Sequence, residues 1–358
     1  MNEWKEVRLG DVLDFHRGYD LPKSEMENGD IPVAGSNGII GFHNKATAIT
    51  PCITIGRSGS IGQPFYYERA WAHNTVLYID DFKGNNPKFL YYLIKILPIS
   101  NFAGGSAVPS LNRNHIHPLV IKFCDDIEKQ KEIAGILSSL DAKIETNNKL
   151  NEKLEEMAQA IFKSWLDGCD ETVQIDDLSL NITDYSKLNK DKVILINSSD
   201  VTNGFFDHHN YSDNNKLKGH FKKRFSKGDI LYSQVRPRNR HWAYCYFDAE
   251  DYIASTQLMV IRNNPEKVSS LLLYQYLISD RVWNEFTLKT ETRSGTFPQG
   301  NYEDLSKICV PYKKDNEKIS KTLEHIYNII YNRYDENQRL ASLRDTLLPR
   351  LMSGELIV

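Results

Sequence analysis

Apolar residues recur every three or four positions from Glu128 to Trp165, which predicts one long amphipathic helix. No proline interrupts this stretch, and at about 1.5 Å per residue the helix would be roughly 57 Å long. Its apolar stripe consists of Ile133, Leu137, Leu140, Ile144, Leu154, Met157 and Ile161. We expect a packing partner to cover this stripe, because a long exposed apolar seam is unfavourable in water.

The same pattern returns 186 positions later in the chain. The second stripe consists of Ile319, Leu323, Ile326, Ile330, Leu340, Leu343 and Leu347. Asn151 and Asn337 are equivalent polar positions on the two stripes, and they lie either in a shared seam or on the surface. Two unrelated amphipathic helices would be a simpler explanation, but seven ungapped matches favour a duplicated unit whose helices pair along these stripes.

The segments before the two helices also repeat. The predicted strands Cys52–Ile55 and Asp229–Ser233 are equivalent, and Ser106–Asn112 aligns with Gly295–Asn301. We therefore expect a mixed α/β fold with an internal pseudo-two-fold duplication. Its parts are a globular domain at 1–126, a long helix at 127–167, a second globular domain at 168–313 and a second long helix at 314–358.

Composition is ordinary for a soluble globular protein, with 358 residues, 25% charged and 41% hydrophobic. Five single cysteines, with no CxxC pair, argue against a disulfide framework and a zinc site, and favour a reducing cytoplasm. The chain begins without a signal peptide and lacks an apolar run long enough for a membrane span. We therefore expect a cytoplasmic protein with no membrane partner.

Sequence motifs for catalysis are absent. The glycine-rich stretch Gly56–Gly62 lacks the Gly-Lys-Ser/Thr of a nucleotide-binding loop, and the ten histidines are dispersed. Asn85-Asn86-Pro87-Lys88-Phe89 resembles the Asn-Pro-Pro-aromatic loop of adenine methyltransferases, but Lys88 replaces the second proline. A helix start is the better explanation for Asn-Pro, so we expect no catalytic and no metal-ligating residues.

Positive charge is concentrated between Lys216 and Trp242, where 27 residues carry a net charge of +8 in a chain of net charge −3. Aromatic and amide side chains are interleaved with these charges, a pattern that suits phosphate neutralisation combined with base recognition. Arginines can contact guanine with two hydrogen bonds, and Gln234 or Asn239 can contact adenine in the same way. The alternative is a solvated basic face.

These considerations give two sets of candidate DNA-binding residues. The first domain contributes Arg17, Lys23, Asn37, Arg57, Ser58, Ser60, His73 and Arg113. The second contributes Lys218, Lys222, Lys223, Arg224, Gln234, Arg236, Arg238, Asn239, Arg240 and Arg293. Arg57 and Arg236 each come just after one of the two equivalent strands, so we expect the duplication to place both at the base-reading ends of their domains.

Five stretches of the chain are distinctive: WKEVRLGDVLDF at 4–15, GSNGIIGF at 35–42, IGRSGSIG at 55–62, the helical segment 128–165, and the ending LRDTLLPRLMSGEL at 343–356. In these stretches the whole chain resembles the specificity (S) subunit of Type I restriction–modification systems. One departure lies at the front of the second unit, where VQIDDLSLNITDYSKLN stands in place of a VRLGD-like start.

The resemblance implies that two target-recognition domains each recognise one half of a bipartite, asymmetric DNA target. It implies that the long helices form an antiparallel coiled coil that sets the spacing and binds two modification (M) subunits. Those subunits carry S-adenosylmethionine and methylate adenine at N6, and restriction (R) subunits use ATP and Mg to translocate and cut DNA. The S subunit itself is non-catalytic and holds no cofactor. The helix residues expected in the coiled coil or against partners are Ile133, Leu137, Leu140, Ile144, Asn151, Leu154, Ile161, Leu323, Ile326, Ile330, Asn337, Leu340 and Leu347.

Two other functions remain as alternatives: a coiled-coil scaffold without a DNA role, and a self-contained DNA-modifying enzyme. The +8 segment argues against the scaffold, and the missing catalytic and cofactor motifs argue against the enzyme.

Overall fold

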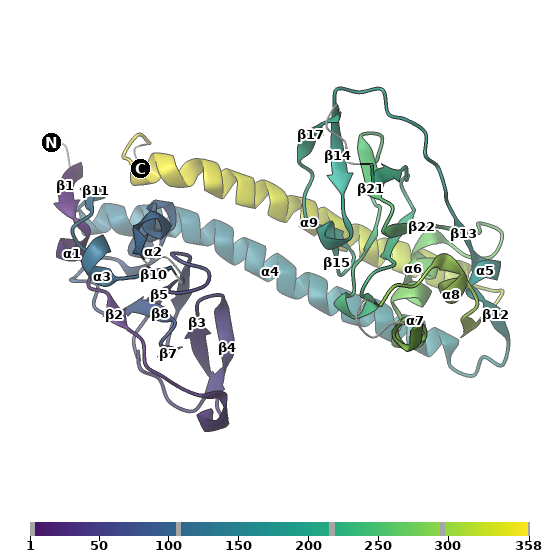
Figure 1. The fold of residues 1–358 in the computed structure, drawn as a ribbon, viewed down its shortest axis with the longest axis horizontal. Helices are drawn as coiled ribbons and strands as arrows, with labels where there is room; N and C mark the ends of the chain where they lie inside the picture. The colour runs from purple at the N-terminus through teal and green to yellow at the C-terminus, as the bar shows by residue number, and fades with distance from the viewer. Residues whose placement is uncertain (1–3, 105–108, 215–218, 294–297, 357–358) are drawn as a thin grey trace. The chain divides into compact units, whose positions relative to one another are not determined.

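The computed structural model describes residues 4–104, 109–214, 219–293 and 298–356, and it divides into two compact units (Figure 1). One unit comprises Met1–Asn147 together with Glu336–Val358, and the other comprises Asn148–Asp335. Two long helices, α4 (Ile127–Leu166) and α9 (Glu317–Met352), contribute residues to both units. Each unit therefore contains one globular domain and a part of each long helix.

The first globular domain is built on a four-stranded sheet in the order β2-β8-β5-β6. These strands are β2 (His16–Arg17), β5 (Cys52–Gly56), β6 (Pro64–Tyr67) and β8 (Val76–Ile79). A three-stranded sheet contains β3 (Ile31–Gly35), β4 (Gly38–His43) and β7 (Trp71–Ala72), and two strand pairs are formed by β1 (Trp4–Arg8) with β11 (Val120–Cys124) and by β9 (Ala103–Gly104) with β10 (Ser110–Leu111). The helices are α1 (Leu9–Val12), α2 (Pro87–Ile96) and α3 (Arg113–Ile116), with short 3-10 turns at Lys23–Glu25 and Ile99–Phe102.

The core of the first unit joins this domain to both long helices. Phe89, Leu90 and Leu93 of α2 are buried in one apolar cluster with residues of α4 and α9. The contributing helix residues are Ile133, Ala134, Leu137, Leu348, Leu351 and Met352. The helices are therefore part of the hydrophobic core of this unit.

The second globular domain contains two four-stranded sheets, in the orders β13-β22-β19-β20 and β17-β14-β21-β18. The first has β13 (Ser179–Asn181), β19 (Ile230–Ser233), β20 (Trp242–Tyr244) and β22 (Leu258–Asn263), and the second has β14 (Lys192–Ile196), β17 (Tyr211–Asp213), β18 (Phe221–Lys223) and β21 (Tyr252–Ser255). Two strand pairs are formed by β12 (Thr172–Gln174) with β23 (Cys309–Pro311) and by β15 (Val201–Thr202) with β16 (Phe205–Phe206). The helices are α5 (Ile175–Leu178), α6 (Ser270–Ile278), α7 (Asp280–Arg293) and α8 (Tyr302–Ser306), with 3-10 turns at Ser198–Asp200 and Pro237–Asn239.

Strand register confirms the duplication. In the first domain Ile53 pairs with Ile79 and Gly56 with Val76. The second domain has the same register, because Ile230 pairs with Ile261 and Ser233 with Leu258, again three residues apart on each strand. Strands β5 and β19 are therefore equivalent, as are β8 and β22, and the predicted mixed α/β fold with two similar domains is confirmed.

The second domain also begins as the first does, although its sequence departs there from the VRLGD-like start. Val7 pairs with Ile121 in β1–β11, and Val173 pairs with Val310 in β12–β23. A short helix follows each strand, and each begins with a backbone N–H that donates to an aspartate, Arg8 to Asp11 and Gln174 to Asp177. The stretch VQIDDL thus takes the place of VRLGDV.

The two long helices pack antiparallel. In the first unit Asp141 accepts a hydrogen bond from Arg344 at 2.6 Å, and Asn147 donates to Asn337 at 2.9 Å. In the second unit Asn151 donates to the carbonyl oxygen of Ile330, at 3.1 Å. As the residue number rises along α4, the number of the contacted residue on α9 falls, so the two helices run in opposite directions.

Most of the predicted stripe lies in the seam, but two equivalent positions do not. Met157 is 44% exposed and Leu343 is 48% exposed. In this part of α4 the buried positions are Asn151, Ala158 and Phe162. Asn147, Asn151, Leu154 and Ala158 follow one another at spacings of four, three and four residues on the packed face of α4. Met157 comes one residue before Ala158, about 100° round the helix, so it lies outside this face.

Candidate nucleic-acid interface

A cavity of about 570 Å³ lies in the first domain, where strand β5 ends. It is lined by Arg17, Arg57, Leu77, Gly104, Ser110, Leu111, Asn112, Arg113 and His115. Three of the predicted DNA-binding residues, Arg17, Arg57 and Arg113, are therefore brought together from distant parts of the chain. Guanidinium groups bind phosphate oxygens and guanine edges, so three arginines around one cavity make it the candidate DNA contact of this domain.

Arg57 is fixed by its backbone. Its N–H donates to the carbonyl oxygen of Thr75 at 2.8 Å, and its own carbonyl oxygen accepts from the N–H of Leu111 at 2.9 Å. The side chain is half-buried, and among the described residues it has no hydrogen-bond partner and no ion pair. The backbone of Arg57 is held in place while its guanidinium group has no internal partner in the described part of the chain, an arrangement that suits a residue that contacts a ligand.

Arg113 is held differently, because its guanidinium donates to the carbonyl oxygen of Phe15 at 3.1 Å. Asn112 precedes it and caps α3 by accepting a hydrogen bond from Asn114 N–H. The Arg113 side chain thus ties the start of α3 to the front of the domain while it lines the cavity.

The loops that carry Asn37, Ser58, Ser60 and His73 converge near Arg57. The hydroxyl of Ser36 donates to the Thr75 carbonyl oxygen that also accepts from Arg57 N–H. His73 shares a 3.0 Å hydrogen bond with the Thr75 hydroxyl. A Cβ added to Gly56 would lie 3.2 Å from the carbonyl oxygen of Ser36, so these two loops are in close contact. Lys23 lies in its own 3-10 turn and does not line the cavity.

In the second domain Gln234, not Arg236, occupies the place of Arg57. Gln234 N–H donates to the Gln257 carbonyl oxygen at 2.9 Å, and its carbonyl oxygen accepts from Gly300 N–H at 2.9 Å. The duplication therefore aligns Arg57 with Gln234, and within the described ranges Arg236 has no equivalent contact with the Gln257 carbonyl oxygen. Arg236 lies two residues further on, in left-handed backbone conformation at φ 48°, and leads into the 3-10 turn Pro237–Asn239.

Several positively charged side chains of the +8 segment form hydrogen bonds within the domain. Lys223 is 6% exposed, and its ammonium group donates to the carbonyl oxygen of Leu258. Burial lowers the pKa of this lysine. Lys222, the preceding residue on the same strand, is exposed, because neighbouring residues of a strand face opposite sides. Lys222 is therefore a candidate phosphate contact, whereas the prediction that Lys223 contacts DNA is wrong because its side chain is buried.

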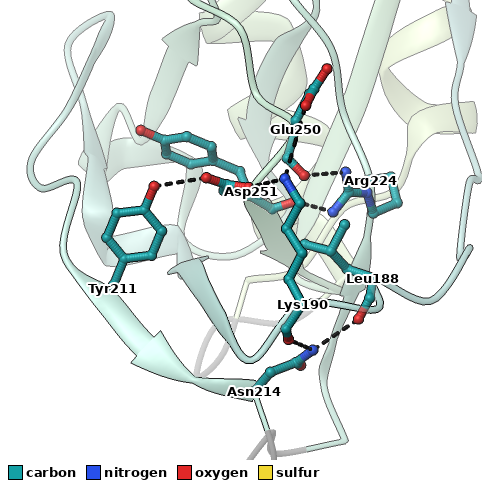
Figure 2. Close-up of polar contacts among 8 residues, drawn as sticks. Leu188, Lys190, Tyr211, Asn214, Arg224, Glu250 and Asp251 are labelled. Atoms are coloured by element: carbon teal, nitrogen blue, oxygen red, sulfur yellow. Dashed lines mark hydrogen bonds and ion pairs between the residues drawn. The ribbon is translucent and has the colours of Figure 1, made fainter.

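Arg224 is also held inside a polar cluster, which Figure 2 shows. Its guanidinium donates to the carbonyl oxygens of Glu250, at 2.7 Å, and Tyr252, at 3.0 Å. Beside it the carboxylate of Asp251 accepts hydrogen bonds from Lys190 and, at 2.7 Å, from Tyr211 (Figure 2). The acidic side chains of this cluster offset the positive charge around Arg224, so this part of the segment does not form one uninterrupted basic face.

The remaining arginines have partners on α7. Arg238 donates to Glu291 at 2.7 Å, and this ion pair raises the pKa of Arg238. The guanidinium of Arg240 lies 4.2 Å from the ring centre of Trp283 and 3.4 Å from Asp280. Asn239 is exposed between them. Lys218 lies outside the described residues, as does the side chain of Arg293.

The methyltransferase-like motif is a helix start. Asn86 caps α2 by accepting a hydrogen bond from Phe89 N–H at 2.9 Å, with Pro87 in the first turn. Gln130 of α4 donates to the side chain of Asn85 and accepts from Asn86 N–H. In the described ranges no three His, Cys, Asp or Glu residues are grouped as metal ligands. None of the helices in those ranges has the length and apolar character needed to cross a membrane.

Comparisons with known proteins agree with this architecture. The family model of the Type I restriction modification DNA specificity domain matches residues 1–156 and again residues 171–341. The HindI specificity subunit of a Type I restriction enzyme from Haemophilus influenzae is 34% identical over 176 residues, which is 48% of this chain and 38% of that subunit. The MjaIX specificity subunit from Methanocaldococcus jannaschii is 23% identical over 309 residues, 76% of this chain and 69% of that subunit.

A crystal structure of the S subunit of a Type I restriction–modification system from M. genitalium has a similar fold, with a TM-score of 0.66 and 16% identity. The similarity covers 97% of this chain and 96% of that one. The match to HindI spans little more than a third of that subunit, so the identity of the family rests on the two matches to its model. With both halves of the chain matched and the duplicated fold in place, this chain belongs to the family of Type I restriction–modification DNA specificity subunits.

Proposed function

We propose that this chain recognises a bipartite, asymmetric DNA target, with one half contacted by each globular domain. The observation that carries this proposal is the cavity lined by Arg17, Arg57 and Arg113 in the first domain. Arg57 has a fixed backbone and a guanidinium without a partner among the described residues, which suits recognition of a DNA group. Lys222, Gln234 and Asn239 are the corresponding candidates in the second domain, since their side chains are at least partly accessible.

DNA binding at several salt concentrations tests this proposal. Each phosphate contact releases counterions, so affinity should fall steeply as salt rises, with a slope of about −0.9 per phosphate contacted. The triple variant Arg17→Ala, Arg57→Ala, Arg113→Ala should bind specific DNA more weakly and with a shallower slope. The matched control is Lys45→Ala, an exposed basic residue of the same domain that does not line the cavity. Salt-independent binding, or equal affinities for the triple variant and the wild type, would contradict the proposal.

The antiparallel helices support a second part of the proposal: they set the distance between the two DNA contacts and bind two methyltransferase (M) subunits. Two contacts on one face of B-DNA lie about 34–36 Å apart for each helical turn between them, so a spacer of defined length is required. The M subunits would supply S-adenosylmethionine and methylate adenine at N6, and the restriction subunits would use ATP and Mg. This chain would bind no cofactor and would meet these partners in the cytoplasm.

A methyl-transfer assay tests the division of labour. The purified chain with S-adenosylmethionine and DNA should transfer no methyl group, whereas addition of the M subunit should produce methylation at N6 of adenine within the target. Methyl transfer by the single chain would contradict the non-catalytic role.

A further inference from the structure

Arg57 and Gln234 occupy equivalent positions in the two globular domains, and three observations establish this. First, each residue comes directly after the equivalent strands β5 and β19, whose pairing with β8 and β22 is in the same register. Second, each donates its N–H to an equivalent carbonyl oxygen, Thr75 for Arg57 and Gln257 for Gln234. Third, each accepts a hydrogen bond from the loop that leads to the next helix, from Leu111 or from Gly300.

The residue after that loop gives the same alignment. Asn112 caps α3 and Asn301 caps α8, each with its side-chain oxygen, and each follows the N–H donor by one position. Arg113 therefore corresponds to Tyr302. Both side chains donate to a backbone carbonyl oxygen at the front of their own domain, Arg113 to Phe15 at 3.1 Å and Tyr302 to Ser179 at 3.0 Å. This pair shares an internal contact with the backbone, whereas no such contact holds the side chain of Arg57 or Gln234 in the described parts of the chain.

The chemical difference at this position indicates what it contacts. Phosphate groups are the same in both half-sites, so a residue that contacts only phosphate has no reason to differ between the domains, whereas a residue that reads a base must differ when the base differs. Here one domain has a cation and the other a neutral amide. Both side chains end in a planar group that forms two hydrogen bonds to one base, Arg with O6 and N7 of guanine and Gln with N6 and N7 of adenine.

We propose that Arg57 and Gln234 are the equivalent base-reading residues, with Arg57 recognising a guanine in one half-site and Gln234 an adenine in the other. This inference rests on the proposed function, because it assumes that both domains contact DNA. It goes further by naming the residue in each domain that distinguishes a G·C from an A·T base pair.

The test is a residue exchange read out by sequence selection. The full chain, with the methyltransferase subunit of its system, selects from double-stranded DNA in which both half-sites and the spacer are randomised. Arg57→Gln should change the preference at one base pair of one half-site from G·C to A·T. Gln234→Arg should make the opposite change at one base pair of the other half-site. A bidentate contact discriminates by about 1–3 kcal/mol, so each preference should change by about 5- to 150-fold.

Two further variants separate base recognition from charge. Arg57→Lys keeps the charge but loses the planar two-donor end, so it should reduce discrimination against other bases at the same position and leave the salt dependence unchanged. Lys45→Gln removes an exposed positive charge from the same domain and should leave the selected sequence unchanged. Folding of each variant is checked by its unfolding midpoint.

The outcomes distinguish this inference from the proposed function. A wild-type complex that selects no sequence at all overturns the proposed function. A wild-type complex that selects a split site, together with an Arg57→Gln variant that binds every sequence more weakly and selects the same site, overturns the inference alone, because Arg57 is then a phosphate contact. Changes in both half-sites from one exchange also overturn it.

Discussion

A carboxylate without solvent exposure lies at Asp229, the single acidic residue of the +8 segment. Its side chain is 0% exposed and accepts from Arg262 at 2.6 and 2.8 Å and from Ser226 N–H at 2.8 Å. Loss of one partner from a buried ion pair leaves the other charge without compensation. Asp229 therefore fixes the turn that leads into β19, and with it the strand that precedes Gln234.

Asp229→Asn should lower the free energy of unfolding by about 2–3 kcal/mol. This is less than for a fully buried pair, because the Arg262 side chain is 42% exposed and retains some hydration. Urea unfolding of the full chain measures the change. Glu291→Gln is the matched control, since it breaks the pair with Arg238, which is 72% exposed, and should cost under about 1 kcal/mol. Equal losses for both variants would show that burial of Asp229 is not the reason.

A second carboxyl group gives a pH-dependent prediction. Burial raises the pKa of Glu155 to about 7 from 4.5, while the hydrogen bond from the Tyr327 hydroxyl at 3.4 Å lowers it. The folded state therefore holds the proton more tightly than the unfolded state. This stabilisation is fully present below about pH 4.5 and is lost as the pH rises through about 7.

Glu155→Gln, which resembles the protonated group, should therefore be more stable than the wild type at pH 8, and the difference should shrink at pH 5. Unfolding midpoints at both pH values measure this. Glu156→Gln changes the neighbouring exposed residue and should show no such dependence on pH. The explanation fails if the Glu155 variant gains no stability at pH 8.

Single residues show what the sequence could and could not predict about the site. The strand ends were accessible from periodicity and turn residues, but the alignment of Arg57 with Gln234 required the backbone hydrogen bonds of the structure. The charge count was less informative, because it treated Lys222 and Lys223 alike although one faces solvent and the other is buried. The partners of Arg224 and Arg238 lie 26 and 53 positions away in the chain, and no local pattern indicates them.

At the scale of elements, the long helices contain a polar layer within an apolar seam. Asn147 is 1% exposed and Asn337 is 8% exposed, and they share a 2.9 Å hydrogen bond. Asn147 also donates to Glu336 at 2.7 Å. A shifted helix pairing would break these bonds and leave buried amides unsatisfied, so the layer favours one register.

A double-mutant cycle tests this layer. Asn147→Leu and Asn337→Leu each remove the hydrogen bond between the two amides in the seam and should each destabilise the chain by about 1–3 kcal/mol. The double variant should be less destabilised than the sum of the two, because the hydrogen bond that the two amides share can be lost only once. Urea unfolding gives the coupling energy, and sedimentation shows whether the loss of the layer permits additional oligomers. Additive losses would mean that the two asparagines do not act together.

The helices were the most predictable elements, because their signal is local and long. The expected segment Glu128–Trp165 became Ile127–Leu166, a difference of one residue at each end. The prediction that failed was the burial of Met157 and Leu343. Met157 and Ala158 both fit a spacing of three or four residues from Leu154 and Ile161, and only packing against the partner helix and the second domain, which buries Ala158, decides between them.

At the scale of the whole molecule, the duplication gives the two long helices similar apolar residues at equivalent positions. Three residues of α9, Leu348, Leu351 and Met352, complete the core of the first domain with Ile133 and Leu137. Their equivalents 186 positions earlier are Phe162, Trp165 and Leu166. All three equivalents are apolar, so the end of α4 carries a surface that can take the place of the end of α9.

A fragment that ends at Asp167 should therefore form a two-fold dimer. The first domain would lose Leu348, Leu351 and Met352 from its core, and a second copy would supply Phe162, Trp165 and Leu166 in their place. Sedimentation measures the dimer, and the variant Phe162→Asp in the same fragment should weaken it by placing a charge in the seam. With the methyltransferase subunit present, both halves of the target should become inverted copies of the half-site recognised through Arg57. A soluble monomer, or a dimer that still marks an asymmetric site, would show that the helices do not pair as the duplication requires.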